Sequence, residues 1–539
     1  MNALVTADWA LRARTLVTRW LILSHRWLGI PLSLIILVWF LSGITMMYAG
    51  GMPRLTPQGR LDHLPALDLA RVRLTPAQAA EPLGGEEALP GAPLLLMIQG
   101  RPAYRFPYAG NATVHADDGS LLEPLDAAAA MSVARQFLRE PAPGLRLVGL
   151  VETPDQWTLS LGRQLPLMKF AAGDARGTEL YVSTLTGEVV LKTTRRDRAL
   201  AWIGTIPHWL YFSALRANQP LWYRIVVTLA ALACVVAVLG LALAFTQWRR
   251  TRPLNLRRSI PYRGGMRWHY IAGAIFGLFV LTWGFSGLLS MEPFAWTNTP
   301  DIRVDPEALT GGEPQLASFD SIDLAALPAL VAPRLIKEVA YLRIHGDHYL
   351  SLRTAAPADA PTASAERRHA PYGVGGRAQE GHVLVDAATM ARHDMPFDSS
   401  EIVARISAAL PDAHMQEQAL LQDYDDYYYS RAQQTPLPVL RIKLDDPLQT
   451  WLYIDPRTSQ IVANIHRYSR IERWLYNGLH SLDFRFWYAK RPLWDLVMLS
   501  LLAGGVVSSS LGLWFGIRRL WRNREPHARH FDRPRNDVP

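Results

Sequence analysis

Hydrophobic residues gather in four long runs along this chain of 539 residues, and charged residues are almost absent from those runs. The runs cover residues 28–49, 222–246, 270–291 and 494–516. Each has the length of about 20 residues that an apolar helix needs to cross a bilayer. The first run starts too late and continues too long for a cleaved signal peptide, so we expect it to be retained. The pattern therefore predicts four membrane-spanning helices.

Two long connections, residues 51–205 and 292–475, lie between the runs and carry mixed patterns. Helical periodicity marks residues 126–138. Alternating strand-like residues around a turn mark two hairpins, residues 180–193 and 451–466. Residues 356–381 are rich in Ala, Pro and Gly without periodicity, which is typical of a flexible excursion. The predicted fold is a membrane α-helical, four-helix bundle carrying two α+β domains.

The two halves of the chain share residue types at equal spacings. His25 and His269 each begin an apolar run with Gly at four, Trp at fourteen and Ser-Gly at seventeen and eighteen residues further on. The matched residues are Gly29 and Gly273, Trp39 and Trp283, Ser42-Gly43 and Ser286-Gly287. His208 and His480 are each followed by Phe at four, Pro-Leu-Trp at twelve to fourteen and Gly at thirty-two. Hydrophobicity alone does not keep such spacings, so we predict two duplicated helix pairs.

The net charge of +9 reflects topology rather than nucleic-acid binding. Residues 247–268 hold seven arginines and no acid, and both ends of the chain are basic. The positive-inside rule places these short segments in the cytoplasm and the long connections outside. The predicted segments are an N-terminus with the first span (1–50), an external domain (51–205), an interfacial segment with the second span (206–248), a basic linker (249–268), the third span (269–291), a second external domain (292–475), an interfacial segment with the fourth span (476–518) and a basic tail (519–539).

Four repeated histidines are the candidate functional residues. The topology places His25 with His269 at the cytoplasmic side, and His208 with His480 near the outer surface. Two facing histidines in a helix bundle are the usual axial ligands of a b-type haem. A single cysteine excludes an internal disulfide, a Cys-ligated iron–sulfur cluster and a CxxCH haem site. Mononuclear zinc or copper is disfavoured, because such sites need three or four close ligands.

Other residues near the histidines have candidate roles. Gly29 and Gly273 remove side-chain bulk where a porphyrin would lie against each helix. Four arginines are candidate partners of haem propionates: Arg26, Arg198, Arg267 and Arg470. Trp39 and Trp283 suit packing or assistance to electron transfer, and the Ser-Gly pairs suit close helix packing.

Two further segments have open interpretations. His345 and His348 suit a surface turn, with metal contact as the alternative. Residues 423–430, DYDDYYYS, suit either an exposed strand or a surface for a cationic or ferric ligand.

The paired histidine-bearing helices, the hairpins YVSTLTGEVV and YIDPRTSQIV, and the segments DDYYYS and ERWLYNGLHSLDF resemble the PepSY-associated transmembrane helix family. The resemblance covers about residues 16–520. It implies a bacterial inner-membrane protein with cytoplasmic termini, periplasmic PepSY-type domains and two bis-His b haems, similar to ferric-siderophore reductases. By motif, His25, His208, His269 and His480 match the haem-ligand positions. The DPxTG-like motif is incomplete in both hairpins, which read STLTG and DPRTS.

The resulting functional prediction is electron transfer from the cytoplasmic side to a periplasmic acceptor, most simply a ferric siderophore reduced in iron uptake. No flavin or nucleotide module is recognisable, so the electron donor is expected to be a separate reductase or a membrane quinol. One alternative is a haem-free membrane anchor whose PepSY domains bind peptides or inhibit a protease. A third reading, a metal or siderophore transporter, is disfavoured because the spans show no mid-helix Pro or charge.

Overall fold

The computed structural model describes residues 2–49, 51–85, 91, 93–107, 109–138, 143–249, 255–294, 304–355, 382–429 and 435–522. The chain divides into two compact units. One is helical and takes the described parts of Met1–Tyr48, Ile203–Trp296 and Trp474–Pro539, and the other takes those of Ala49–Trp202 and Thr297–Arg473. The excursion predicted for residues 356–381 lies outside the described residues.

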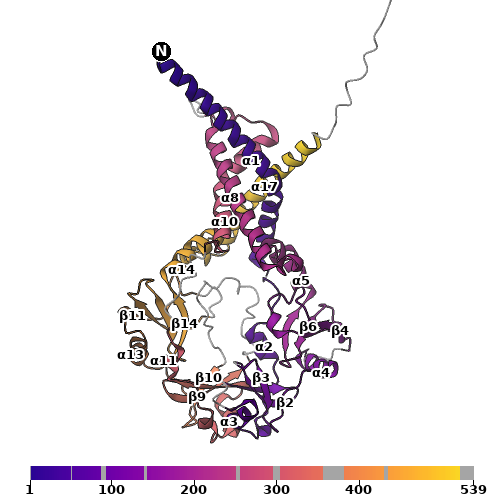
Figure 1. The fold of residues 1–539 in the computed structure, drawn as a ribbon, viewed down its shortest axis with the longest axis vertical. Helices are drawn as coiled ribbons and strands as arrows, with labels where there is room; N and C mark the ends of the chain where they lie inside the picture. The colour runs from indigo at the N-terminus through magenta and orange to yellow at the C-terminus, as the bar shows by residue number, and fades with distance from the viewer. Residues whose placement is uncertain are drawn as a thin grey trace, which may run out of the picture. The chain divides into compact units, whose positions relative to one another are not determined.

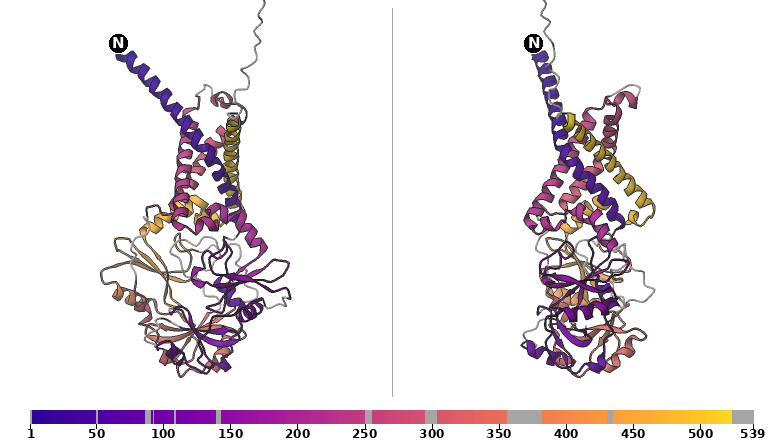
Figure 2. Two further views of the ribbon diagram at one scale, coloured as in Figure 1. Left: turned by 45° about the vertical axis from the view of Figure 1, so that its right-hand side comes forward. Right: turned by 90° about the vertical axis from the view of Figure 1, so that its right-hand side faces the viewer.

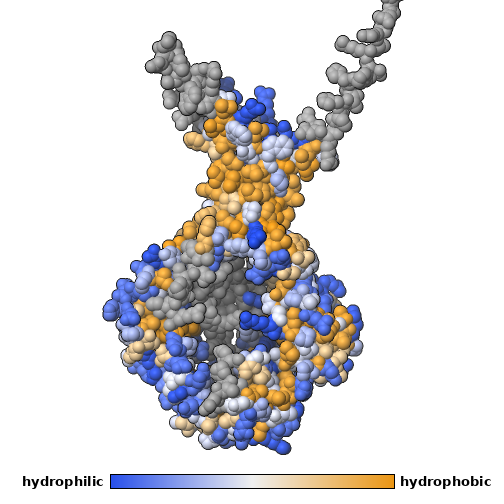
Figure 3. Space-filling view, viewed as in Figure 1, coloured by the Kyte–Doolittle hydropathy of each residue, from blue (hydrophilic) through white to orange (hydrophobic). Residues whose placement is uncertain are grey.

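Four long helices form the helical unit, and they run together as one bundle (Figures 1 and 2). They are α1 (Asn2–Tyr48), α8 (Gln219–Thr246), α10 (Gly264–Leu289) and α17 (Leu493–Arg522). Within the described residues, these four are long and apolar enough to cross a membrane. Apolar side chains cover most of the visible face of the bundle (Figure 3), as expected for contact with lipid. The prediction of four helices that are long and apolar enough to span a membrane is confirmed.

The helices pair in a regular way. Helix α1 packs against α17 and α8, and α10 packs against α8 and α17. All four continue without a break, although Pro31 lies inside α1, which corrects the expectation that the first span lacks an internal proline. Proline removes one backbone donor from a helix, a loss that a membrane helix tolerates when its neighbours support it. The broken helices typical of transporters are therefore not found among these four.

Short helices precede α8 and α17 in the helical unit. Those before α8 are α6 (Thr205–Trp209) and α7 (Ser213–Arg216), and those before α17 are α15 (Leu479–Ser481) and α16 (Arg485–Tyr488). Helix α6 packs against α1, and α15 packs against α10. These contacts hold His208 and His480 against the long helices.

The other unit is an α+β body built around three antiparallel sheets. A six-stranded sheet has the order β10-β9-β8-β1-β2-β3 and takes strands from both long connections. Its strands are β1 (Leu94–Ile98), β2 (Arg101–Phe106), β3 (Ala112–His115), β8 (Ile336–Ile344), β9 (Asp347–Thr354) and β10 (His382–Asp386). The two halves meet where β1 pairs with β8, with Leu95 opposite Val339. Both residues are buried in the apolar core of this sheet.

Two four-stranded sheets repeat one plan. The first contains β4 (Arg146–Val151), β5 (Leu167–Ala171), β6 (Glu179–Ser183) and β7 (Val189–Thr193). The second contains β11 (Met415–Leu421), β12 (Val439–Leu444), β13 (Trp451–Asp455) and β14 (Gln460–Ile465). An amphipathic helix precedes each sheet, α4 (Ala127–Leu138) or α13 (Ser399–Ala409), and the core of each sheet includes residues of that helix. The predicted helix and both predicted hairpins are thus present.

The described part of residues 423–430 follows β11 and is not a strand, which corrects the exposed-strand interpretation. Tyr428 is fully buried and stacks on Tyr453 at 4.8 Å between ring centroids. Asp425 accepts the backbone N–H of Tyr427 and Tyr428 and the hydroxyl of Tyr453, at 2.7–2.9 Å. The segment therefore folds back over the sheet as a packed loop, and its tyrosine side chains pack in the core.

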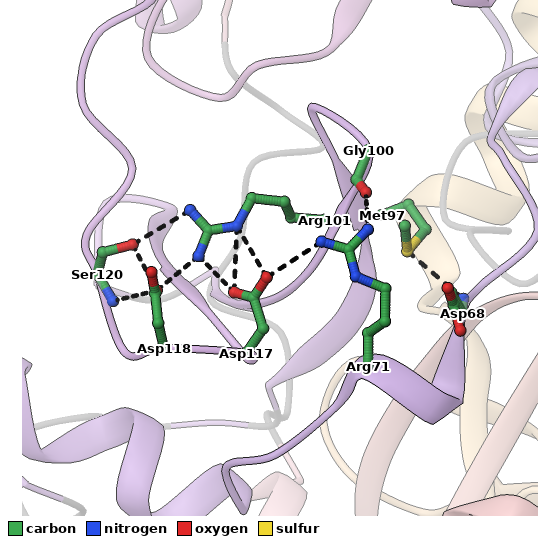
Figure 4. A network of polar contacts seen from close by, with 8 residues as sticks. All are labelled: Asp68, Arg71, Met97, Gly100, Arg101, Asp117, Asp118 and Ser120. Atoms are coloured by element: carbon green, nitrogen blue, oxygen red, sulfur yellow. Dashed lines mark hydrogen bonds and ion pairs between the residues drawn. The ribbon is translucent and has the colours of Figure 1, made fainter.

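Two ionic networks fix loops to the six-stranded sheet. At the turn after β3, Arg101 pairs with Asp117 and Asp118, and Arg71 donates to Asp117 at 3.3 Å (Figure 4). Deeper in the unit, Glu338 is fully buried between Arg60 and Arg353. Buried carboxylates are costly unless paired, and together the two arginines keep the pKa of Glu338 below its usual value.

Candidate functional site

The structure brings the four repeated histidines together as two pairs within the helical unit. His25 of α1 faces His269 of α10, with 6.4 Å between ring centroids. His208 of α6 faces His480 of α15, with 6.2 Å between ring centroids. The sequence-based pairing of these side chains is therefore correct in space, while their role as ligands is still a prediction.

The two pairs lie far apart along the bundle. His208 contacts Ser42 of α1, which is seventeen residues after His25. At a rise of 1.5 Å per residue, this separation is about 25 Å along the helix. The same count separates His269 from Ser286, the contact of His480 on α10. The pairs therefore lie at opposite ends of the hydrophobic part of the bundle.

Backbone carbonyls orient the first pair. Nδ1 of His25 lies 3.1 Å from the carbonyl oxygen of Val236, and Nδ1 of His269 lies 3.1 Å from that of Ser508. A carbonyl can only accept, so Nδ1–H is the donor in both contacts. The lone pair of each ring is then on Nε2, which is the nitrogen suited to a metal.

Two repeated glycines make these carbonyls reachable. Gly240 and Gly512 follow Val236 and Ser508 by four residues, on the next helical turn. A Cβ atom at Gly240 would lie 3.0 Å from Cε1 of His25, and one at Gly512 would lie 3.5 Å from Cε1 of His269. The missing side chains therefore let each imidazole rest on the neighbouring helix beside the carbonyl it bonds.

Serine hydroxyls orient the second pair. Ser42 Oγ lies 3.0 Å from Nδ1 of His208, and Ser286 Oγ lies 2.9 Å from Nδ1 of His480. Each hydroxyl also donates to a carbonyl of its own helix, at 2.6 Å to Val38 for Ser42 and at 3.1 Å to Trp283 for Ser286. With its hydrogen used in this way, the serine oxygen accepts Nδ1–H, and the lone pair again falls on Nε2.

The Ser-Gly pairs also pack against these rings. A Cβ at Gly43 would lie 3.7 Å from Cε1 of His208, and one at Gly287 would lie 4.0 Å from Cε1 of His480. Burial lowers the pKa of His208 to about 4, so this imidazole is neutral at physiological pH. A neutral ring keeps the lone pair that coordination requires.

The residues present fit a haem held between two imidazoles. Each pair brings two imidazole rings to centroid separations of 6.4 and 6.2 Å, which supplies the two nitrogen ligands that a bis-His haem uses. A Cβ built at Gly29 or Gly273, one turn after each histidine of the first pair, would meet no atom within 4 Å. Both glycines therefore leave room for a flat group beside the helix.

Apolar and aromatic side chains fill the bundle between the pairs. Phe40 is buried against α17, where a Cβ at Gly505 would lie 2.4 Å from its ring, and it meets Trp283 edge-on at 5.5 Å. Trp39 and Trp283 both pack on this core. The packing interpretation of the tryptophans is correct, and assistance to electron transfer stays a prediction.

The four predicted arginines lie in two different environments. Arg26 and Arg267 are partly buried and flank the first histidine pair in sequence, on α1 and α10. Arg198 and Arg470 belong to the α+β unit, where they bond to its hairpins. Arg198 donates to Thr193 and Gly177 at 2.6 and 3.0 Å, and Arg470 donates to Gln449 and Ile465 at 2.8 and 3.1 Å. Pairing of any of the four with a propionate is still a prediction.

The remaining histidine candidates take part in hydrogen bonds of the α+β unit. His345 sits in the tight turn between β8 and β9, 2.8 Å from Ser459 Oγ and 3.1 Å from Glu401. His348 accepts the backbone N–H of Gln315 at 3.2 Å. Throughout the described part of the chain, no three His, Cys, Asp or Glu side chains gather as a metal site.

Sequence reasoning missed the contacts that orient the histidines. The signals were present as the equal spacing of Ser42 and Ser286 and of Gly240 and Gly512 in the two halves. Only the structure shows that each residue contacts a histidine from another segment of the chain.

Comparison with known proteins agrees with this architecture. A family profile described as the PepSY-associated TM region matches residues 22–421, which include His25, His208 and His269. No curated protein matches the chain. The matched region spans most of the sequence and three of the four membrane helices, and the chain therefore belongs to the PepSY-associated transmembrane family.

Proposed function

We propose that this protein carries electrons across a bacterial inner membrane through two bis-His b haems and reduces a periplasmic ferric chelate. The observation that carries the proposal is the pair of facing imidazoles at each end of the bundle, 6.4 and 6.2 Å apart. When bound at such sites, haem supplies reversible one-electron exchange without a covalent intermediate.

The protein's own residues would perform three tasks. His25 and His269 would hold one haem, and His208 and His480 the other. The Nδ1 contacts fix each ring's tautomer and angle, a role that usually supports metal affinity strongly. The apolar core between the sites excludes water, so electrons rather than ions or chelates would pass through the bundle.

The arginine-rich linker and the basic segments near both ends of the chain support cytoplasmic termini and a periplasmic α+β unit. This orientation underlies the direction that we propose for the electrons. Electrons from a quinol or a cytoplasmic reductase would then arrive near His25 and His269. They would leave near His208 and His480 for a ferric siderophore or a similar chelate. The matched halves support descent from one duplicated helix pair.

Sealed vesicles test this function. Purified protein is inserted with dithionite enclosed, and a ferric trihydroxamate chelate and a ferrous-iron indicator are placed outside. Ferrous iron should appear outside, and His25→Ala or His208→Ala should abolish it. The control His414→Ala removes an exposed histidine outside both pairs and should leave the rate unchanged. No external reduction by haem-loaded protein would refute transmembrane electron transfer.

A haem-free PepSY anchor that binds peptides or inhibits a protease is the second candidate. It is favoured by the share of the chain in the α+β unit, which is larger than a minimal electron relay needs. A protein that folds and inserts normally, yet takes up no haem, would support this candidate instead.

A further inference from the structure

One end of the helical unit carries arginines and no acidic residue. Residues 15–30, 247–268 and 512–522 lie at this end, and they hold two, seven and three arginines without any Asp or Glu. Among the described residues, six of these arginines are exposed and no carboxylate pairs with them. Together they are named the basic end: Arg19, Arg249, Arg258, Arg263, Arg518 and Arg519.

The first histidine pair lies close to the basic end. His269 is five residues after Gly264, where α10 begins, and Gly240, which borders His25, is six residues before α8 ends at Thr246. At 1.5 Å per residue, these separations are about 8 and 9 Å along the helices. The second pair lies about 25 Å further along the bundle. A redox partner at the basic end would therefore stand near the first pair and far from the second.

The chemistry of this end favours a donor that delivers an electron without a proton. Oxidation of a quinol releases protons, and a site for that reaction needs a base to receive them. The three segments contain no carboxylate. The nearby histidines, His25 and His269, have Nδ1 bonded to backbone carbonyls, and their Nε2 atoms are the proposed haem ligands. An iron–sulfur cluster, by contrast, exchanges single electrons and needs no base beside its acceptor.

We propose that the basic end docks an acidic, soluble iron–sulfur protein that supplies electrons to the His25/His269 site. This inference rests on the proposed function and names the class of its donor. One electron leaves the partner's cluster, which is oxidised, and reduces the haem iron held by His25 and His269. No bond forms and no proton moves in this step.

Charge is the basis of the recognition. Membrane topology accounts for the sign of the arginines. Because no described carboxylate neutralises the basic end, its charge is available to a partner of opposite sign. Opposite charges steer two proteins together and raise the rate of encounter at low salt. Redox partners of this kind need only a small interface, which lets the oxidised carrier leave quickly.

Stopped-flow reduction of the haem-loaded protein tests the inference. The protein is held in nanodiscs of zwitterionic lipid, and the probe is a reduced plant-type [2Fe–2S] ferredoxin, which is acidic and soluble. The second-order rate constant should fall about tenfold as salt rises from about 20 to about 300 mM, because screening removes the steering. Arg518→Glu combined with Arg519→Glu should lower it about tenfold at low salt.

Arg485→Glu combined with Lys490→Glu is the matched control. It makes the same change of charge at two exposed residues in and after α16, near the second pair, and should leave the rate constant unchanged. Binding of oxidised ferredoxin to the immobilised protein is measured in parallel. It should weaken in the Arg518/Arg519 double variant and stay unaltered in the control.

The outcomes separate this inference from the proposed function. No ferredoxin binding at low salt, a rate constant that ignores salt, equal losses in the two double variants, or reduction by ubiquinol-1 alone would overturn the docking surface. Each of these would leave transmembrane electron transfer standing. A protein that binds ferredoxin through the basic end yet holds no haem would instead overturn the proposed function.

Discussion

Replacement of Gly240 by Ala tests the contact that orients His25. The new Cβ would lie 3.0 Å from Cε1 of His25, whereas an ordinary carbon–carbon contact is about 3.5 Å. The ring must therefore retreat by about 0.5 Å. The hydrogen bond from Nδ1 to Val236, now 3.1 Å, then reaches the outer limit of useful geometry.

The expected loss is specific to haem binding. Removing such an outer-shell contact typically costs 10–100-fold in metal affinity, or about 1.4–2.7 kcal/mol. The α8 helix itself should gain about 0.5–1 kcal/mol, since Ala replaces Gly within it. The variant should therefore fold as well as the original protein and yet bind one haem more weakly.

Gly512→Ala is the matched comparison. There the Cβ would lie 3.5 Å from Cε1 of His269, which is an ordinary contact that needs no ring movement. The assay is the rate at which each haem passes to excess apomyoglobin, with thermal unfolding in detergent as the measure of folding. Equal haem loss from the two variants would refute the steric reasoning.

Two further predictions concern the stability of the helical bundle and of the α+β unit. Gly505→Ala places a Cβ 2.4 Å from the Phe40 ring, so overpacking should destabilise the bundle by about 1–3 kcal/mol, and Phe40→Leu should restore part of this loss in thermal unfolding. Glu338→Gln removes the carboxylate that Arg60 and Arg353 share, while Arg60 keeps Glu188, and should destabilise the α+β unit by about 1.5–3 kcal/mol in urea. Burial alone would raise the pKa of Glu338, but Arg60 and Arg353 hold it below its usual value. This stability should be full above the unfolded pKa near 4.5 and should fall as pH drops through the folded pKa, whereas a flat profile would contradict the pairing.

The sequence was sufficient where one local pattern decides the structure. Apolar runs marked the spanning helices, and strand alternation marked the hairpins that became β6–β7 and β13–β14. The histidine pairs also followed from sequence, since topology and repetition leave few ways to group four residues at two bundle ends. Hydropathy did not show that α1 begins at Asn2, because a membrane run marks only the apolar part of a longer helix.

Contacts between distant segments could not be predicted from the sequence. The pairing of β1 with β8 joins residues more than 240 positions apart, and no local pattern sets its register. The fold-back of residues 423–429 depends on the Asp425 contacts, which a string of acids and tyrosines does not reveal. A small residue such as Ser42 can serve either close packing or hydrogen bonding. Its contact with His208 could therefore be recognised only from the three-dimensional structure.

The haem content of the purified protein, counted as the pyridine haemochrome after expression with adequate haem supply, tests the central claim most directly. The arrangement of the four histidines predicts two low-spin b haems per chain, falling to one in His25→Ala and to one in His208→Ala. A folded, membrane-inserted protein without haem, or with both haems retained in either variant, would contradict the claim.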